Sequence, residues 1–128
     1  MELPKDAMLL RIFFGERDRL DGKPLYEAIV KEARQAHMAG ATVLRGPMGY
    51  GHSTRVHRSS FLDISEDLPI VIEIVDTLEK IDGFLPVLDG MMKSGLVTLE
   101  KVQVLTYGPN EKRRQKDVEV SVDRRQKL

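Results

Sequence analysis

The chain has 128 residues and no cysteine, and its 20 basic side chains balance its 20 acidic ones. This length fits one domain with one core, and the lack of cysteine excludes disulfides, thiolate zinc sites and cysteine nucleophiles. A net charge of zero gives no overall field that attracts nucleic acid, so we expect no nucleic-acid partner. Because the stretch MELPKDAMLL does not resemble a signal peptide and no apolar run approaches the roughly 20 residues of a membrane span, we expect a cytoplasmic protein.

The first part of the chain predicts a strand, a helix and a second strand. Residues 7–14 (AMLLRIFF) are rich in apolar and β-favouring side chains, which is typical of a buried strand. After a polar loop, Pro24 suits the first turn of a helix, where its missing N–H is not needed. Apolar residues continue at helical spacing as far as Ala36, and we expect Gly40 to end this helix in a left-handed conformation. Residues 41–45 predict the second strand.

The second part predicts two more strands, a helix and a closing strand. Residues 59–64 are expected to return from a glycine-rich loop, and residues 68–75 (LPIVIEIV) give the strongest strand pattern. Asp76 is expected to cap the helix that follows, and Pro86 is expected to kink this helix or to break its hydrogen-bond ladder. Residues 97–107 predict one or two closing strands. The apolar positions of the second helix recur at helical spacing: Ile81, Phe84, Leu85, Leu88 and Met91.

This order of elements predicts an α+β domain of the ferredoxin-like, or split βαβ, class. One antiparallel sheet would carry both helices on one face. Because residues 68–75 are apolar on both faces, we expect the other face to be covered by further copies of the chain. We expect the domain to occupy residues 1–108 and a basic C-terminal tail to occupy residues 109–128.

The tail is the most charged segment. It holds seven basic and four acidic residues, a net charge of +3, which leaves −3 on the rest of the chain. One interpretation is a solvated tail; the other is an arm that folds over a neighbouring subunit or an anionic ligand. Val118, Val120 and Val122 alternate, which also allows a short added strand.

The stretch VLRGPMGYGHSTRVHRS, residues 43–59, concentrates glycine and positive charge. Its glycines suit either a wide hairpin with positive φ angles or a nest of backbone N–H groups around an anion. Its arginines lie in a window without acidic residues and are suited to phosphate or carboxylate. Lys93, before the last strand, can add a charge from a neighbouring subunit. The residues concerned are Gly46, Gly49, Gly51, Arg45, Arg55 and Arg58.

Other polar residues allow weaker hypotheses. His52 and His57 invite a divalent metal, but they fall on opposite sides of an ideal strand, which favours solvent-exposed histidines. Glu16, Asp18 and Asp21 are more typical of turn and capping hydrogen bonds than of acid–base catalysis, and pairing with arginines across a subunit boundary is a further alternative. The residues carry no recognisable catalytic constellation, so we expect no enzyme and no required cofactor.

The stretches RIFFGERDRLDGKPLYEAIV, AGATVLRGPMGYG and ISEDLPIVIEIVD resemble the PII-like family known as domain of unknown function 190 (DUF190). The similarity runs over about residues 7–107. It implies a ferredoxin-like fold and a homotrimer related to PII signal proteins and CutA-like proteins. In such trimers adenine nucleotides (AMP, ADP or ATP) bind between subunits. A T-loop between the second and third strands reports occupancy to a target, which in some members is a membrane transporter.

The resemblance implies that the glycine-rich stretch and residues 91–96, before the last strand, form one nucleotide site. PII proteins proper carry a glycine-rich phosphate loop before the last strand, whereas residues 91–96 here hold one glycine and one lysine. Two alternatives stay open: a CutA-like divalent-metal-binding trimer using His52 and His57, and a trimeric scaffold without a small ligand. The expected ligand-binding residues are Arg45, Gly46, Gly49, Gly51, Arg55, Arg58, Lys93 and Gly95.

Overall fold

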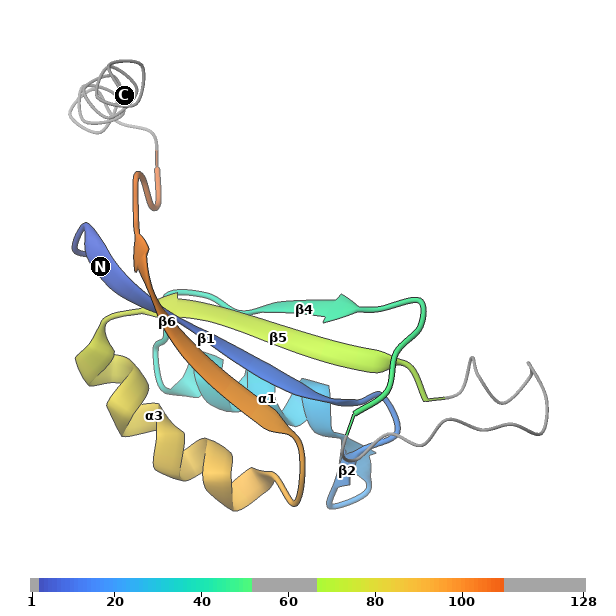
Figure 1. Ribbon diagram of the computed structural model, residues 1–128. Helices are drawn as coiled ribbons and strands as arrows, with labels where there is room; N and C mark the ends of the chain where they lie inside the picture. Colours follow the sequence, from blue (N-terminus) through green and yellow to red (C-terminus); the bar gives the residue numbers. More distant parts are fainter. Residues whose placement is uncertain (1–2, 52–66, 110–128) are drawn as a thin grey trace.

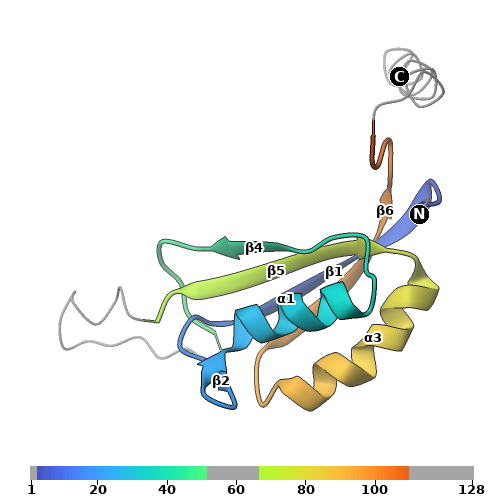
Figure 2. The same cartoon turned by 180° about the vertical axis from the view of Figure 1, so that it is seen from behind.

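The computed structural model describes residues 3–51 and 67–109, which form an antiparallel sheet with both long helices on one face (Figures 1 and 2). The order of the main elements confirms the expected ferredoxin-like arrangement. A small hairpin, β2 (Arg19–Leu20) and β3 (Lys23–Pro24), precedes the first helix. The main elements are β1 (Asp6–Gly15), α1 (Leu25–Gln35), β4 (Thr42–Arg45), β5 (Pro69–Asp76), α3 (Leu78–Met91) and β6 (Leu96–Gln103). The strand expected at residues 59–64 lies outside the described residues.

The strands of the sheet follow the order β4-β5-β1-β6, so β1 and β5 are central and β4 and β6 are the edges. All pairings are antiparallel and in continuous register, with Ile12 opposite Ile72 on one side and Val97 on the other. No helix of the described part has the length and apolar character needed to cross a bilayer.

The core lies between the sheet and the helices. Alternate residues of the central strands, Leu10 and Ile12 of β1 and Ile72 and Ile74 of β5, are fully buried against Phe84 and its neighbours on the helices. Period-two alternation in the strands and helical spacing in α1 and α3 thus place their apolar residues in one layer. Each large side chain buried in this way contributes roughly 1.5–3 kcal/mol to folding.

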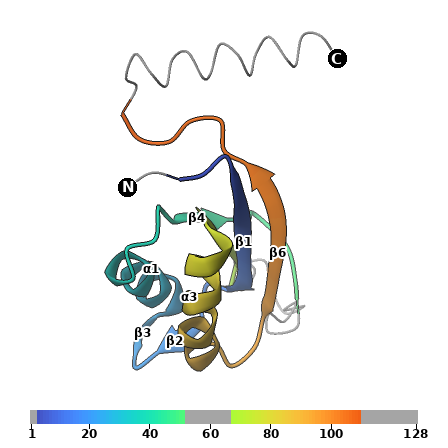
Figure 3. The ribbon, with the colours of Figure 1, turned by 90° about the vertical axis from the view of Figure 1, so that its left-hand side faces the viewer.

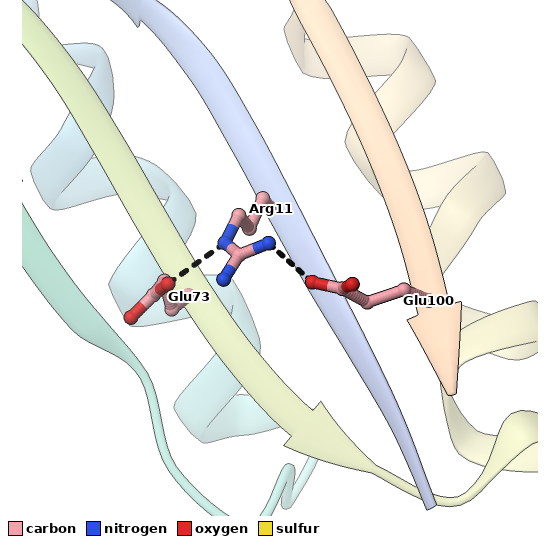
Figure 4. Close-up of polar contacts among 3 residues, drawn as sticks. All are labelled: Arg11, Glu73 and Glu100. Atoms are coloured by element: carbon pink, nitrogen blue, oxygen red, sulfur yellow. Dashed lines mark hydrogen bonds and ion pairs between the residues drawn. The ribbon is translucent and has the colours of Figure 1, made fainter. Parts of the chain in front are cut away.

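No helix of the described residues lies on the opposite face of the sheet (Figure 3). Its centre is charged, because Arg11 of β1 lies between carboxylates from both neighbouring strands (Figure 4). The Arg11 Nε donates to Glu73 Oε2 at 2.9 Å, and its Nη1 donates to Glu100 Oε1. Hydrogen bonding to Glu73 is the main cause that raises the pKa of Arg11 above its ordinary value. Exposed Leu44 and Leu96 lie toward the two edges of this face.

A segment after β6, residues 104–109 (the strap), ties the C-terminal end of β6 to the connection between α1 and β4. The Val104 N–H donates to Lys5 O at 2.6 Å, which continues the pairing of β6 with β1. The Tyr107 hydroxyl donates to Ala39 O at 2.5 Å. The strap therefore closes one end of the uncovered face, over a cavity of about 620 Å³ that Leu9 and Val75 help to line.

Two expected helix boundaries are wrong. In each case a residue near the expected one ends or caps the helix. The left-handed residue after α1 is His37, with φ 58°, rather than Gly40. The cap of α3 is Thr77, whose Oγ1 accepts the Lys80 N–H at 3.1 Å. Asp76 is buried, and its carboxylate accepts the N–H groups of Thr77 (2.7 Å) and Ala39 (2.8 Å). Pro86 lies inside α3, which continues beyond it to Met91.

Candidate functional site

One end of the sheet collects the segments that the sequence analysis selected for ligand binding. The last residue of β4, Arg45, pairs with Ile70 of β5, which pairs with Phe14 of β1. The first residue of β6, Leu96, pairs with Phe13. The described parts of the connections at this end, residues 15–18, 46–51, 67–68 and 92–95, are called the loop end below.

Glycines let the chain leaving β4 fold closely over the start of β5. The Gly46 N–H donates to Pro69 O at 2.8 Å. A Cβ on Gly46 would lie 2.9 Å from the Pro69 Cγ, and one on Gly49 would lie 3.1 Å from it. Neither glycine has a positive φ, so these two positions do not supply the positive φ angles of the wide-hairpin interpretation. They are needed because the proline ring leaves no room for a side chain.

Arg45 leaves β4 on the side of the sheet that carries the helices and forms an ion pair across the loop end. Its Nη1 lies 3.0 Å from Oε2 of Glu16, which follows β1. The Arg45 side chain is 59% exposed and that of Glu16 is 22% exposed. An incoming anion therefore meets a guanidinium that is accessible but already shared with a carboxylate. The sequence predicted Glu16 in a turn or paired with an arginine of another subunit, whereas the sheet order brings it to Arg45 of its own chain.

Carboxylates organise the backbone beside this pair. The Arg17 N–H donates to Asp67 Oδ1 at 3.1 Å, and the Gly15 N–H lies 3.4 Å from Asp18 Oδ2. Burial raises the pKa of Asp18 above its ordinary value, the charge of Asp67 adds to the rise, and the Gly15 N–H partly opposes it. The expected turn role is confirmed for Asp18, whose carbonyl also accepts the first N–H of α1, from Leu25.

The connection between α3 and β6 supplies the second expected segment. Gly95 has φ 135°, and a Cβ there would lie 2.5 Å from Phe13 O, so only glycine fits. Lys93 is exposed, whereas the Ser94 Oγ is buried and has no hydrogen-bond partner within the described structure. These residues border a cavity of about 710 Å³ beneath the end of α3. Ser94 was not predicted as a site residue, because no local pattern distinguishes it in the sequence.

The two segments start from opposite edges of the sheet. Arg45 ends one edge strand and Lys93 precedes the other. Three strand spacings separate these edges, a distance of about 14 Å. Arg45 and Lys93 therefore mark opposite edges at the same end of the sheet.

The remaining expected residues fall at or beyond the limit of the described chain. Gly51 is the last described residue of its segment, and Arg55, Arg58, His52 and His57 lie outside. Met48 and Tyr50 are 75% and 79% exposed, which makes them the most exposed large apolar side chains of the described part. Residues 3–51 and 67–109 contain no group of three or more potential ligands from His, Cys, Asp and Glu that is arranged for a metal.

Comparison of the sequence with known families matches residues 7–104 to DUF190, described as "Uncharacterized ACR". A UPF0166 protein of Aquifex aeolicus is 39% identical over 97 residues, which cover 76% of this chain and 91% of the relative. A UPF0166 protein of Methanocaldococcus jannaschii is 34% identical over 99 residues, which cover 77% of this chain and 91% of the relative.

Comparison of the structure finds the same fold in PII-like proteins. A PII-like signalling protein of Thermus thermophilus superposes with a TM-score of 0.55 at 20% identity, over 77% of this chain and 89% of its own. CPII of Thiomonas intermedia, a nitrogen regulatory PII-like protein bound to ADP, AMP and bicarbonate, gives a TM-score of 0.51 at 21% identity, over 77% and 88%. At these identities the structural likeness establishes the fold alone. The family match covers both segments of the loop end, and the chain belongs to the DUF190 family of PII-like fold.

Proposed function

We propose that this chain is a PII-like regulatory protein that binds a small anionic ligand, with an adenine nucleotide as the favoured candidate. It would act as a cytoplasmic homotrimer rather than as an enzyme. The ligand would sit between the β4 edge of one copy and the β6 edge of the next. The segment after Arg45 would change conformation on binding and present the signal to a target protein, such as a membrane transporter.

One observation carries this proposal: the two expected ligand-binding segments lie at the same end of the sheet but on opposite edges. Head-to-tail contacts that close into a ring place opposite edges of neighbouring copies side by side. Arg45 would then face the turn around Lys93 of the next copy. The relative CPII, with its bound ADP, AMP and bicarbonate, supports the ligand class.

The Arg45–Glu16 ion pair suggests how binding would be transmitted. A phosphate that takes the guanidinium from Glu16 would release the carboxylate and loosen the junction between β4, β1 and β5. The ligand thus stabilises one of two arrangements of the segment, and the shift is limited by its differential affinity for them. Exposed ion pairs contribute about 0.2–1 kcal/mol, so exchanging one for a phosphate is energetically accessible.

Calorimetry with AMP, ADP, ATP and bicarbonate, alone and in pairs, tests the proposal. Arg45→Ala and Lys93→Ala should each weaken nucleotide binding, whereas Arg34→Ala, at the other end of α1, should leave it unchanged. Glu16→Gln should strengthen binding by about two- to fivefold, because it removes a carboxylate that competes for Arg45. Light scattering should report a trimer. Binding that is indifferent to Arg45 and Lys93, or a chain that stays monomeric with ligand bound, would overturn this site.

A further inference from the structure

A cavity of about 710 Å³ lies beside β6, between the C-terminal half of α3 and the first residues of the strand. Apolar side chains form part of its wall, among them Leu85 of α3 and Val97 of β6. Val97 pairs with Ile12 and therefore lies on the face of the sheet that carries the helices (the helix side), yet it is 41% exposed. Because β6 is an edge of the described sheet, this cavity lies where the proposed function places the next copy.

Two carboxylates line the cavity without a cation of their own. Asp82 and Asp89 are seven residues apart on α3, so they lie on nearly the same face of the helix. Within residues 3–51 and 67–109 neither forms an ion pair. Asp89 lies in the last turn of α3, where the helix dipole disfavours an acidic residue. Together with Lys93, the three charged side chains of the lining carry one excess negative charge, which one further cation would neutralise.

Ser94 adds a polar atom that lacks a partner. Its Oγ is buried and has no hydrogen-bond partner among the residues that the structure describes, and Ser94 belongs to the lining of the same cavity. Buried polar atoms are normally paired, so the missing partner indicates a group that enters from outside the described residues of one copy. The cavity therefore suits an occupant with an apolar part, a positive charge and hydrogen-bond donors.

The free edge of β4 carries two side chains of this description. Val43 pairs with Ile72, which is buried against the helices, so Val43 and Arg45 both lie on the helix side. Val43 is 37% exposed, and the Arg45 side chain is 59% exposed. A guanidinium has five N–H groups, and the ion pair of Arg45 with Glu16 is made through Nη1. Arg45 therefore keeps donors for a second acceptor.

A ring of copies brings these side chains to the cavity. Where opposite edges adjoin, rotation about the ring axis carries the helix side and the loop end of one copy onto those of the next. We propose that Val43 and Arg45 of one copy enter the cavity of the next copy. There Arg45 meets Asp89 at the end of α3, and Val43 covers the apolar wall around Val97. This inference rests on the ring of the proposed function and names the contact that joins its copies.

The contact links ligand binding to the assembly of the copies. Without ligand, the Arg45 guanidinium is shared by Glu16 of its own chain and Asp89 of the next copy. A phosphate bound between Arg45 and Lys93 takes the guanidinium from both carboxylates. Asp89 is thus a positioning residue, which acts on the ligand through Arg45. Nucleotide binding and the contact between copies then oppose each other, and each weakens the other by the same factor.

Cysteine cross-linking tests the position of Val43. The chain has no cysteine, so Val43→Cys can be combined with one cysteine on β6 and no competing thiol. Val97→Cys and Leu99→Cys place that cysteine on the helix side, whereas Thr98→Cys places it on the uncovered face as a matched control. Closure of a sheet staggers neighbouring strands, so both helix-side positions are tested. Within one chain the two edges are about 14 Å apart, too far for a disulfide.

Oxidation should join the copies through Val43→Cys and at least one of the two helix-side cysteines, up to a covalent trimer on a non-reducing gel. The Thr98→Cys control should stay unlinked. Light scattering on the same proteins separates the outcomes. A trimer that is linked through Thr98→Cys, or through neither helix-side position, would overturn this inference and leave the trimer of the proposed function intact. A monomer would overturn both.

Titration with ADP tests the role of Asp89. Asp89→Asn should raise the affinity for ADP about two- to fivefold, because it removes one exposed ion pair that competes for Arg45. In an Arg45→Ala background the same substitution should have no effect, since Asp89 acts through the guanidinium. Glu79→Gln, which removes a carboxylate from α3 outside the lining of the cavity, is the matched control and should leave the affinity unchanged.

Two results of this titration would contradict the positioning role. One is an affinity that Asp89→Asn does not change, and the other is an equal gain in both backgrounds, which would indicate direct repulsion between Asp89 and the phosphate. If the unaltered chain does not bind ADP while the cross-link forms, the nucleotide of the proposed function is overturned and the contact between copies stands.

Discussion

Gly95 is the residue at which the backbone leaves least room for a side chain. Its φ of 135° is accessible to few residues other than glycine, and an added Cβ would lie 2.5 Å from a carbonyl oxygen of β1. Gly95→Ala should therefore destabilise the fold by about 2–4 kcal/mol, because strain and a backbone clash add together. Urea unfolding measures the change.

Gly40 provides the control for this prediction. A Cβ at Gly40 meets no atom within 4 Å, and its φ is not positive. Gly40→Ala should therefore change the free energy of unfolding by less than about 1 kcal/mol. Equal costs at the two positions would show that the contact with Phe13 does not constrain this turn.

Asp18 predicts a pH dependence at the loop end. Its pKa is raised in the folded chain, chiefly by burial, so the folded state takes up a proton at a higher pH than the unfolded state does. The contribution of this group to stability therefore rises as pH falls through the folded pKa, and at neutral pH its charge opposes folding. Asp18→Asn should be the more stable protein at pH 7, and the difference should shrink toward pH 4. Thermal melts of both proteins over this range measure it, and a gap that widens on acidification would contradict the burial argument.

At the scale of elements, the start of α3 depends on Thr77 rather than on the acidic residue before it. Thr77→Ala removes the acceptor for the Lys80 N–H and should cost about 1 kcal/mol of stability. Thr77→Ser keeps the oxygen and should lose clearly less. If both variants unfold at the same urea concentration, the capping hydrogen bond does not stabilise the helix.

The elements were predictable where periodicity is strong and less so where a single hydrogen bond decides. Residues 68–75 and the helix containing Ile81 and Phe84 follow clear two-residue and helical periods, and the structure confirms both. The cap of α3 was misplaced by one residue because Asp76 is drawn inward by the Ala39 N–H, a contact 37 positions away. Local pattern does not contain that information.

The sequence predicted which residues the candidate site contains, but not how they are arranged in space. The glycines and Arg45 stood out in the sequence, and they do lie at one end of the sheet. The pairing of Arg45 with Glu16 depends on which strands are neighbours, and sequence spacing does not reveal that. The distance between Arg45 and Lys93 likewise follows from strand order, which local residue patterns leave undetermined.

For the whole molecule, the charged centre of the uncovered face bears on assembly. Arg11 is shared between Glu73 and Glu100, so the three side chains carry one excess negative charge. In the proposed trimer this cluster would lie where copies approach one another, and removal of Arg11 would leave two unneutralised carboxylates there. Arg11→Met should therefore increase the fraction of monomer at micromolar concentration, as measured by light scattering.

Two controls belong to that experiment. Arg34→Met removes an arginine from the exposed side of α1 and should leave the oligomer intact. Circular dichroism should show that the Arg11 variant remains folded, because its core-facing neighbours Leu10 and Ile12 are untouched. An Arg11→Met protein that remains trimeric would remove this cluster from the interface.

The strand β4 is fastened unequally at its two ends. Just before the start of β4, the Ala39 N–H donates to the Asp76 carboxylate and the Ala39 carbonyl accepts the Tyr107 hydroxyl. At the far end, the contacts include the Arg45–Glu16 ion pair, which is partly exposed, and the hydrogen bond from the Gly46 N–H to Pro69 O. Local opening of β4 should therefore begin at Arg45, and the amide exchange rates should decrease from Arg45 toward Thr42. The start of β4 would keep its position while Arg45 moves. Ligand binding at Arg45 would therefore change the conformation of the segment that follows β4 and leave the core unchanged.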